Sequence, residues 1–384
     1  MPRPCMAIMC SANGGVRVIP ESASQAAALL RDGRALQAQG LYINPGGLCI
    51  HIRSNSTEFI EQLAVYFSHV AVEACDAAVS IEAYDTDVLT LDVDWTDWPR
   101  EPGKTGRKDA IHELAGGRLL RKVRTGMLFL QSTEAVIAAG PCRALDNQVI
   151  NFINSQYMNW LQRQGWLICH AAALDLNGHG VGIAGLSGGG KSTLMLALMD
   201  KPGVAYVTND RLFIKRDNGT VRAAGIPKMP RINPGTIVHN PVLHGLIGAD
   251  RRSELLALPK DELWHLEEKH DAMIATLYGA ERVLQESRLD TFLVLNWSRD
   301  TRDATRLDAV DLAARQDLLP AIMKSPGPFY QLADGSLYQA SMHADPQLYL
   351  DALQGVQILE ASGRVDTELL KDQLYTWITG RQAQ

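Results

Sequence analysis

The sequence lacks both the long apolar runs of a membrane protein and the long basic runs of a nucleic-acid-binding arm. No stretch approaches the roughly 18 consecutive apolar residues that a membrane-spanning helix needs. No block of Lys or Arg stands out either, and the formal net charge is −6. These absences predict a soluble protein with neither nucleic acid nor a membrane as a main partner.

The chain also lacks the C-x-x-C and Cys/His spacings that are typical of metal sites and redox motifs. Its six cysteines are scattered, at Cys5, Cys10, Cys49, Cys75, Cys142 and Cys169. The apolar run from Cys5 to Cys10 is shorter than the hydrophobic region of a secretory signal. We therefore expect a reducing, cytoplasmic setting.

With 384 residues, of which 46% are hydrophobic, the chain can bury a sizeable core, and its length favours two domains. The pattern predicts a small α+β domain of unknown role over residues 1–145, because short strands and two helices alternate there without recognisable chemistry. Its expected elements are helices from Ser22 to about Gln39 and from Ser56 to Phe67, with strands at 48–53, 79–84, 88–93, 119–132 and 135–139. A helix from Asp146 to Gly165 should open a second domain, 146–384.

The most informative stretch is a complete G-x-x-x-x-G-K-[ST] phosphate loop. The small apolar run Val181–Ala184 before it predicts a strand, and Ser192 to Met199 after it predicts a helix. Backbone N–H groups of such a loop hold phosphates, Lys191 reaches the outer phosphates, and the Ser192 hydroxyl binds Mg²⁺. The nucleotide-binding residues expected here are Gly185, Ser187, Gly188, Gly189, Gly190, Lys191, Ser192 and Thr193.

The residues around the loop predict further parts of a site. Ala171–Leu176, the turn pair Asn177-Gly178 and 180–184 read as a hairpin that leads into the loop. A strand at Val204–Thr208, expected to pair with the 181–184 strand, ends at Asn209-Asp210, where an acid can hold Mg²⁺. Downstream, the pattern predicts a helix from Leu307 to Met323, and then a last strand and helix.

From His170 to Arg211 the chain resembles the HPr kinase/phosphorylase family, and within it the HPr-kinase-related kinase B group. His170 stands fifteen residues before Gly185, the loop reads G-x-S-G-x-G-K-S, and Asn209-Asp210-Arg211 stands where the family has Asp-Asp-Arg. The resemblance implies a P-loop kinase core of the phosphoenolpyruvate-carboxykinase type. It also implies ATP and Mg²⁺ as ligands and a hydroxyl group as acceptor. Two departures are Asn209 itself and the lack of an E-x-R-G-x-G signature, so the acceptor is left open.

Five side chains are candidates for catalysis: His170, Lys191, Asn209, Asp210 and Arg231. A histidine in an apolar strand is most often a core residue, but the spacing of His170 from the loop favours a function. Asp210 can bind Mg²⁺ together with Ser192, or accept the proton of the attacking hydroxyl, or simply cap a turn. Asn209 cannot act as a base but can orient a hydroxyl, and Arg231, like Lys228, can neutralise phosphate charge.

Two functions of different classes follow from these residues. The first is an ATP-dependent kinase that acts on a hydroxyl of a protein, a peptide or a small metabolite. The second is a nucleotide-binding regulatory protein that has lost phosphoryl transfer, because Asn209 replaces an acid. A homo-oligomer is compatible with either.

Overall fold

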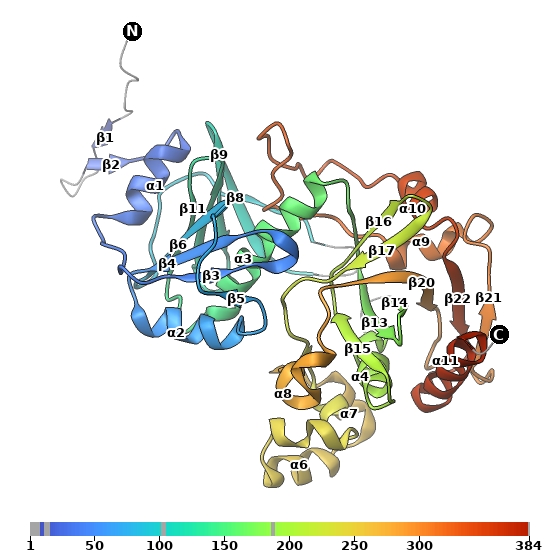
Figure 1. Ribbon diagram of the computed structural model, residues 1–384. Coiled ribbons are helices and arrows are strands. Elements are labelled where there is room, and N and C mark those ends of the chain that lie inside the picture. The colour runs from blue at the N-terminus through green and yellow to red at the C-terminus, as the bar shows by residue number, and fades with distance from the viewer. Residues whose placement is uncertain (1–7, 11–15, 101–104, 186–188, 383–384) are drawn as a thin grey trace. The chain divides into compact units, whose positions relative to one another are not determined.

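The computed structural model describes all residues except 1–7, 11–15, 101–104, 186–188 and 383–384. Its contacts divide the chain into two compact units. Unit 1 consists of Met1–Arg163 and Pro326–His343, and unit 2 of Gln164–Ser325 and Ala344–Gln384. Within the described residues each unit is built on one nine-stranded sheet with helices, so the protein is mixed α/β (Figure 1).

Unit 1 is a mixed sheet in which β4, β6 and β11 run parallel and the other pairings are antiparallel. In sheet order its strands are β5 (Ala71–Val72), β3 (Leu41–Ile43), β4 (Ile50–Ser54), β6 (Val79–Asp85), β11 (Val136–Gly140), β10 (Leu128–Ser132), β9 (Gly117–Lys122), β8 (Asp109–Leu114) and β7 (Thr96–Asp97). A separate pair is β1 (Ile8–Cys10) with β2 (Val16–Val18), and a 3₁₀ turn, η1, spans Pro45–Gly47. Helix α1 (Ala23–Arg31) packs on β9, β10 and β11, and α2 (Thr57–Tyr66) packs on β3 and β4.

Local signals predicted some elements of unit 1 and not others. Ser56 caps α2 as expected, since its hydroxyl accepts a hydrogen bond from the Phe59 N–H at 3.2 Å. Helix α1 is capped by Ser22 in the same way, but it ends at Arg31 and not at Gln39. Asp32 and Gly33 both adopt positive φ, which terminates the helix. The strand expected at 88–93 is irregular chain.

Helix α3 (Asp146–Arg163) forms where the sequence predicts it, but its contacts assign it to unit 1. Phe152 of this helix packs against Phe129 of β10 and against Phe329, with ring centroids 4.9 and 5.0 Å apart. The contacts therefore place the first boundary between the units after Arg163, whereas the sequence predicts it at residue 145. The reason is that the buried face of the helix completes the core of the first unit.

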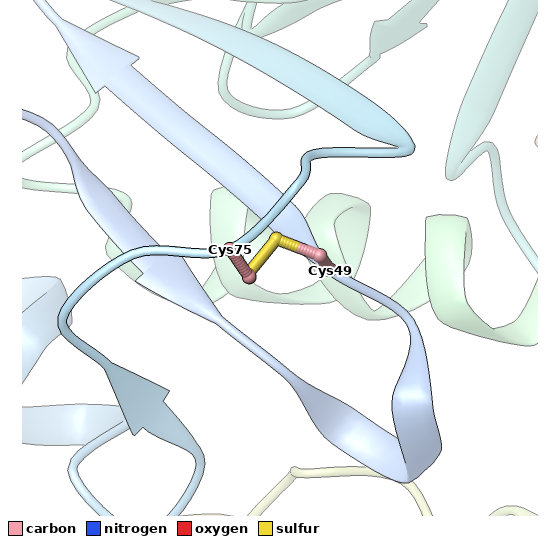
Figure 2. Close-up of a disulfide and its surroundings, with 2 residues drawn as sticks. All are labelled: Cys49 and Cys75. Carbon is pink, nitrogen blue, oxygen red and sulfur yellow. A yellow bond between two sulfur atoms is a disulfide. The ribbon is translucent and has the colours of Figure 1, made fainter.

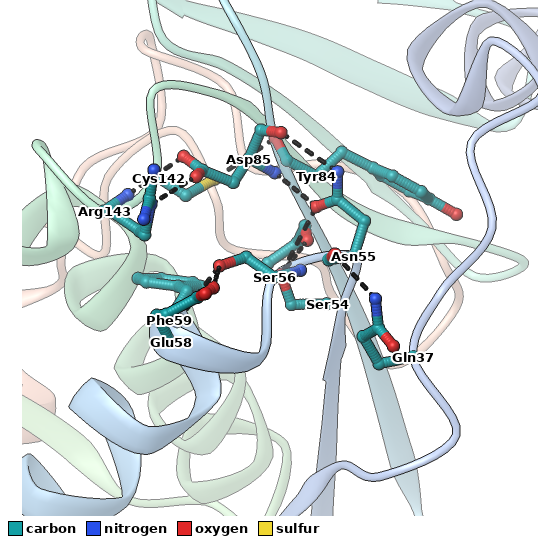
Figure 3. Close-up of polar contacts among 11 residues, drawn as sticks. Gln37, Ser54, Asn55, Ser56, Glu58, Phe59, Tyr84, Asp85, Cys142 and Arg143 are labelled. Atoms are coloured by element: carbon teal, nitrogen blue, oxygen red, sulfur yellow. Dashed lines mark hydrogen bonds and ion pairs between the residues drawn. The ribbon is translucent and has the colours of Figure 1, made fainter.

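The carboxyl ends of β4 and β6 are joined by a closed set of polar contacts (Figure 3). The Asn55 amide accepts from the Asp85 N–H at 2.7 Å and donates to the Asp85 carbonyl at 3.0 Å. The Asp85 carboxylate in turn accepts from the Arg143 guanidinium at 2.7 Å. Because these groups bond to one another, the set explains why the chain turns as it does here and needs no ligand.

A disulfide joins Cys49, just before β4, to Cys75, in the connection between β5 and β6 (Figure 2). The sequence separation is 26 residues, and spacing alone cannot reveal such a pairing. Cys142 and Cys169 are free and buried. Disulfides persist mainly in oxidising compartments, so this bond does not support the reducing setting expected from the sequence, and a cytoplasmic location stays a prediction.

Unit 1 is completed by a segment from far along the chain, Pro326–His343. The guanidinium of Arg118 on β9 is 1% exposed and donates to the carbonyls of Pro328 and Tyr338 at 2.8 and 3.0 Å. It also pairs with the Glu113 carboxylate. A buried charge is tolerated only where it is fully paired, so Arg118 requires the returning segment.

Unit 2 is a second mixed sheet, with β20 at its centre. In order, the strands are β12 (Leu167–Cys169), β16 (Leu212–Asp217), β17 (Thr220–Ala224), β20 (Glu286–Leu295), β14 (His179–Gly185), β13 (Ala171–Leu176) and β15 (Val204–Thr208), with β22 (Gln357–Ser362) paired to β20 and to β21 (Arg306–Ala309). Strand β20 pairs with β17 through its first residues and with β22 through its last ones. A short ladder of β18 (Arg231–Ile232) and β19 (His270–Asp271) lies apart.

The hairpin β13–β14 forms as predicted, because Asn177 and Gly178 adopt the positive φ values, 51° and 85°, of a two-residue turn. The expected pairing of the 181–184 strand with the 204–208 strand is wrong. Strand β13 lies between them and pairs antiparallel with both. Strands β14 and β15 are therefore parallel in direction, and their carboxyl ends still reach the same edge of the sheet.

The helices of unit 2 vary in length. They are α4 (Lys191–Met199), α5 (Pro234–Ile237), η2 (Pro241–Leu246), α6 (Ala249–Leu256), α7 (Lys260–His265), α8 (Ile274–Tyr278), η3 (Ala280–Arg282), η4 (Gln316–Leu318), α9 (Leu319–Ile322), α10 (Pro346–Ala352) and α11 (Thr367–Gln382). The helix expected from Leu307 to Met323 forms only near its end, as η4 and α9, because its first residues pair with β22 as part of β21. No helix among the described residues has the length and apolarity to cross a membrane.

Candidate active site

Three strand ends place the predicted site residues at one edge of the sheet in unit 2. Ala171 at the start of β13 pairs with Ala184 near the end of β14, and Ala173 pairs with Thr208 at the end of β15. His170, the phosphate loop and Asp210 immediately adjoin these positions. The sheet register therefore brings together residues that are up to 40 positions apart in the sequence.

The phosphate loop runs from the end of β14 into α4. Gly190 has a φ of +86°, which suits glycine, and α4 begins at Lys191. The Lys191 ammonium donates to the Gly185 carbonyl at 2.7 Å, and the side chain folds back across the start of the loop. Ser187 and Gly188 lie outside the described residues.

The loop and the helix that follows it are held by neighbouring elements. The Trp297 indole N–H, just after β20, donates to the Gly189 carbonyl at 2.8 Å. The hydroxyls of Thr193 in α4 and Thr236 in α5 are 2.8 Å apart. Thr193, expected at the nucleotide, thus contacts the segment that follows β17. Ser192 is partly exposed in the same first turn of α4.

His170 and Asp210 contact each other, as their positions in the sequence suggest. His170 Nε2 lies 3.3 Å from Asp210 Oδ1, and the side chains are 20% and 40% exposed. The His170 backbone N–H donates to the Ile322 carbonyl at 2.8 Å, which holds the residue between β12 and β13. Asp210 Oδ2 is paired with the guanidinium of Arg211.

The charges around this pair keep Asp210 ionised. Burial raises the pKa of its carboxyl, but the charge of Arg211, the hydrogen bond with His170 and the charge of Lys228 outweigh burial, so the pKa lies well below its usual range. Asp210 is therefore a carboxylate at neutral pH, able to accept a proton or to bind a cation.

His170 is a neutral imidazole at neutral pH. The hydrogen bond to Asp210 raises its pKa, but burial and the positive charges of Lys191 and Lys324 outweigh that bond, so the pKa lies below its ordinary value. A neutral ring that donates from Nε2 to a carboxylate carries its lone pair on Nδ1. Asp210 thus orients His170, and either group can receive a proton.

Two lysines add positive charge beside the pair. Burial lowers the pKa of Lys228 to about 8; Asp210 raises it, and Arg211 and Arg231 lower it further. The Lys228 backbone carbonyl is anchored by the Tyr206 hydroxyl at 2.9 Å. Lys324, which acts on His170, follows α9. An excess of cations at one sheet edge suits a ligand with several negative charges.

Asn209 and Arg231 differ in how they are partnered. Asn209 Oδ1 is buried and has no hydrogen-bond partner among the described residues. Such an atom is costly unless a ligand donates to it. The Arg231 guanidinium is 3.3 Å from the Asp271 carboxylate across the β18–β19 ladder, so this candidate already has an ionic partner.

Sequence reasoning missed Lys324 and Trp297. Lys324 is brought to His170 because Cys169 and Met323 form an isolated β-bridge, a contact across 154 residues of chain. Trp297 reaches the loop because β20 pairs in parallel with β14 and ends beside Gly185. Neither residue belongs to a motif, and only the strand pairing identifies them.

Comparison with known proteins adds little to these findings. No family model matches the chain, and no curated protein matches it. Among solved structures, the HPr(Ser) kinase/phosphatase from Coxiella burnetii is similar over 56% of this chain and 93% of that one, with 13% identity and a TM-score of 0.28. A likeness this low carries no argument, so function has to be argued from the residues of the site.

Proposed function

We propose that the chain is an ATP-dependent phosphotransferase that transfers the γ-phosphoryl group of ATP to a hydroxyl of a protein, a peptide or a small metabolite. The observation that carries the proposal is the convergence of the Lys191 loop and the His170–Asp210 pair at one sheet edge. ATP phosphates would lie along the loop, and the acceptor hydroxyl would lie beside the pair. All of these residues belong to unit 2, in support of a kinase domain within 146–384.

Each residue has a distinct task in this reaction. Lys191 neutralises the outer phosphates, and the Asn209 amide orients the acceptor hydroxyl, whose single proton stays available to the base. Asp210, directly or through His170, takes the hydroxyl proton as the phosphoryl group is transferred. Lys228 and Arg231 stabilise charge on the transferred group.

The residues present fit Mg²⁺ as the accompanying ion. Ser192 and Asp210 offer hard oxygen donors, and among the described residues no group of three His, Cys, Asp or Glu side chains forms a metal cluster. Mg²⁺ prefers one or two protein oxygens together with water and substrate phosphates, which suits this sparse donor set. Bound Mg²⁺ supplies neutralisation of the phosphate charge.

Transfer of label from [γ-³²P]ATP tests the proposal. The parent protein should label an acceptor in cell extract or in a panel of hydroxyl compounds, and Lys191→Ala should not. Lys201→Ala is the matched control, because Lys201 lies just beyond the same helix and pairs with Asp372 on the surface. Equal labelling by the parent and Lys191→Ala would overturn the proposal.

The regulatory alternative is motivated by Asn209, which stands where a kinase of the resembled family has an acid. In that case the parent binds ATP but labels nothing. Asn209→Asp would then gain transfer, because the site would recover a second carboxylate beside Asp210. Labelling by the parent would exclude this alternative.

A further inference from the structure

Beside the phosphate loop lies an aromatic cluster that the proposed chemistry does not use. It consists of Trp297, just after β20, Arg299, two residues further on, and Trp264 of α7. The guanidinium carbon of Arg299 lies 3.4 Å from the centre of the Trp264 ring, which is close stacking. We call these three residues the Trp264 platform.

Two separate sets of contacts tie the platform to the loop. From one side, the Trp297 N–H is bonded to Gly189, and its ring lies 3.4 Å from the position a Cβ would take on Gly190. From the other side, the backbone of α7 at Leu263 is 3.5 Å from a Cβ position on Gly235 in α5. Thr236 of α5 then contacts Thr193 in the first turn of α4. Trp297 therefore contacts the loop directly, and Trp264 lies on a helix that packs against the same segment, α5, that contacts the first turn of α4.

Two residues of the platform keep part of their surface open to solvent. Trp264 is 38% exposed although its neighbour Leu263 is buried in a small cluster with Val238 and Leu255. The Arg299 side chain is 43% exposed, and the Asp261 carboxylate, 4.0 Å away, is 93% exposed. A stacked pair of an indole and a guanidinium with open surface is a good support for a further planar ring.

We infer that the Trp264 platform binds the base of the nucleotide whose phosphates lie on the loop. This inference rests on the proposed function, because it places the rest of the same ligand. The base stacks on the exposed surface of Trp264 and Arg299, while Trp297 holds the loop at Gly189. Stacking recognises any base through its π face, so the platform adds affinity for nucleotides over bare phosphate chains.

Calorimetric binding of two ligands, MgATP and magnesium tripolyphosphate, tests the inference. Tripolyphosphate occupies the loop but has no base, so the parent should bind ATP more tightly. Trp264→Ala should weaken ATP binding about tenfold, the order expected for loss of one stacked base, and leave tripolyphosphate binding unchanged. Trp264→Phe, which keeps a ring, should restore most of the difference.

Leu256→Ala is the matched control, because Leu256 is a 52% exposed apolar residue on the neighbouring helix α6. It should bind both ligands as the parent does. If Trp264→Ala bound ATP as tightly as the parent, or weakened tripolyphosphate equally, the platform would not be the base site. If the parent bound neither ligand, the proposed function itself would fall, and the base site with it.

Discussion

Polar groups gather at strand ends in both units, but with opposite consequences. In unit 1 the set at the ends of β4 and β6 is closed, because Asn55, Asp85 and Arg143 use their hydrogen bonds on one another. In unit 2 the set at the ends of β14 and β15 is open. Cations exceed carboxylates there, and Asn209 Oδ1 has no partner among the described residues. The completeness of the hydrogen bonds is therefore the basis on which we treat the first set as structural and propose the second as a site.

The largest expected effect is on phosphoryl transfer by the open set. Asp210→Asn should reduce turnover about a hundredfold or more, which is the usual contribution of a general base. His170→Ala should reduce it less while ATP binding is largely retained, and Asn209→Ala should be milder than either. Turnover and ATP affinity measured on all three variants check this order. If Asp210→Asn and His170→Ala both left transfer unchanged, the assigned roles would fail.

Breaking the disulfide should affect stability alone. Loss of the Cys49–Cys75 bond in Cys75→Ser frees a closed loop of 26 residues, and we expect about 3 kcal/mol lower free energy of unfolding. Urea unfolding of the variant, with Cys142→Ser as the thiol control, measures this loss. ATP binding, which we propose for unit 2, should not change, and a parallel fall in ATP affinity would contradict this separation.

Replacing one asparagine in each set with alanine compares the closed set of unit 1 directly with the open set of unit 2. Asn55→Ala removes both hydrogen bonds to the Asp85 backbone and should lower the free energy of unfolding by about 1 to 3 kcal/mol, with transfer intact. Asn209→Ala removes an amide oxygen that has no partner among the described residues, so its stability should match or exceed that of the parent. Denaturant unfolding curves measure the free energy of unfolding of both variants. If Asn209→Ala were the less stable of the two, the set in unit 2 would also be structural.

The smallest effect concerns pH. The pKa of Lys228 is lowered from 10.5 to about 8, so the side chain is charged below pH 8 and loses its charge as pH rises through that value. ATP affinity should therefore fall across this range in the parent. Lys228→Arg keeps the charge and should flatten the decline. Identical pH profiles for the two proteins would exclude Lys228 from the phosphate site.

The parts of the fold that the sequence predicted depend on short-range chemistry. The Asn177-Gly178 turn and the Ser56 cap form through contacts within four residues, so their residue types suffice. The strand and the helix that flank the phosphate loop are local in the same sense. His170 and Asp210 were linked through the spacing of a resembled family, and the structure places them in contact.

The parts that the sequence did not predict depend on pairing between distant segments. The insertion of β13 between β14 and β15 follows from the whole sheet, and no residue in any one strand signals it. The position of Lys324 beside His170 has the same origin. Residues 307–309 begin a stretch whose sequence pattern predicts a helix. In the structure they belong to β21, because pairing with β22 outweighs the local preference.

The return of Pro326–His343 to unit 1 has a consequence for synthesis of the chain. Arg118 is buried by carbonyls that a ribosome makes only after most of unit 2. At about 5 to 20 residues per second, the stretch between Arg163 and Pro326 takes roughly ten to thirty seconds to translate. During that time the first sheet exists without the segment that pairs its buried charge. The amino-terminal unit therefore cannot finish folding until most of unit 2 has been made, and a fragment that stops at Arg163 would not reproduce it.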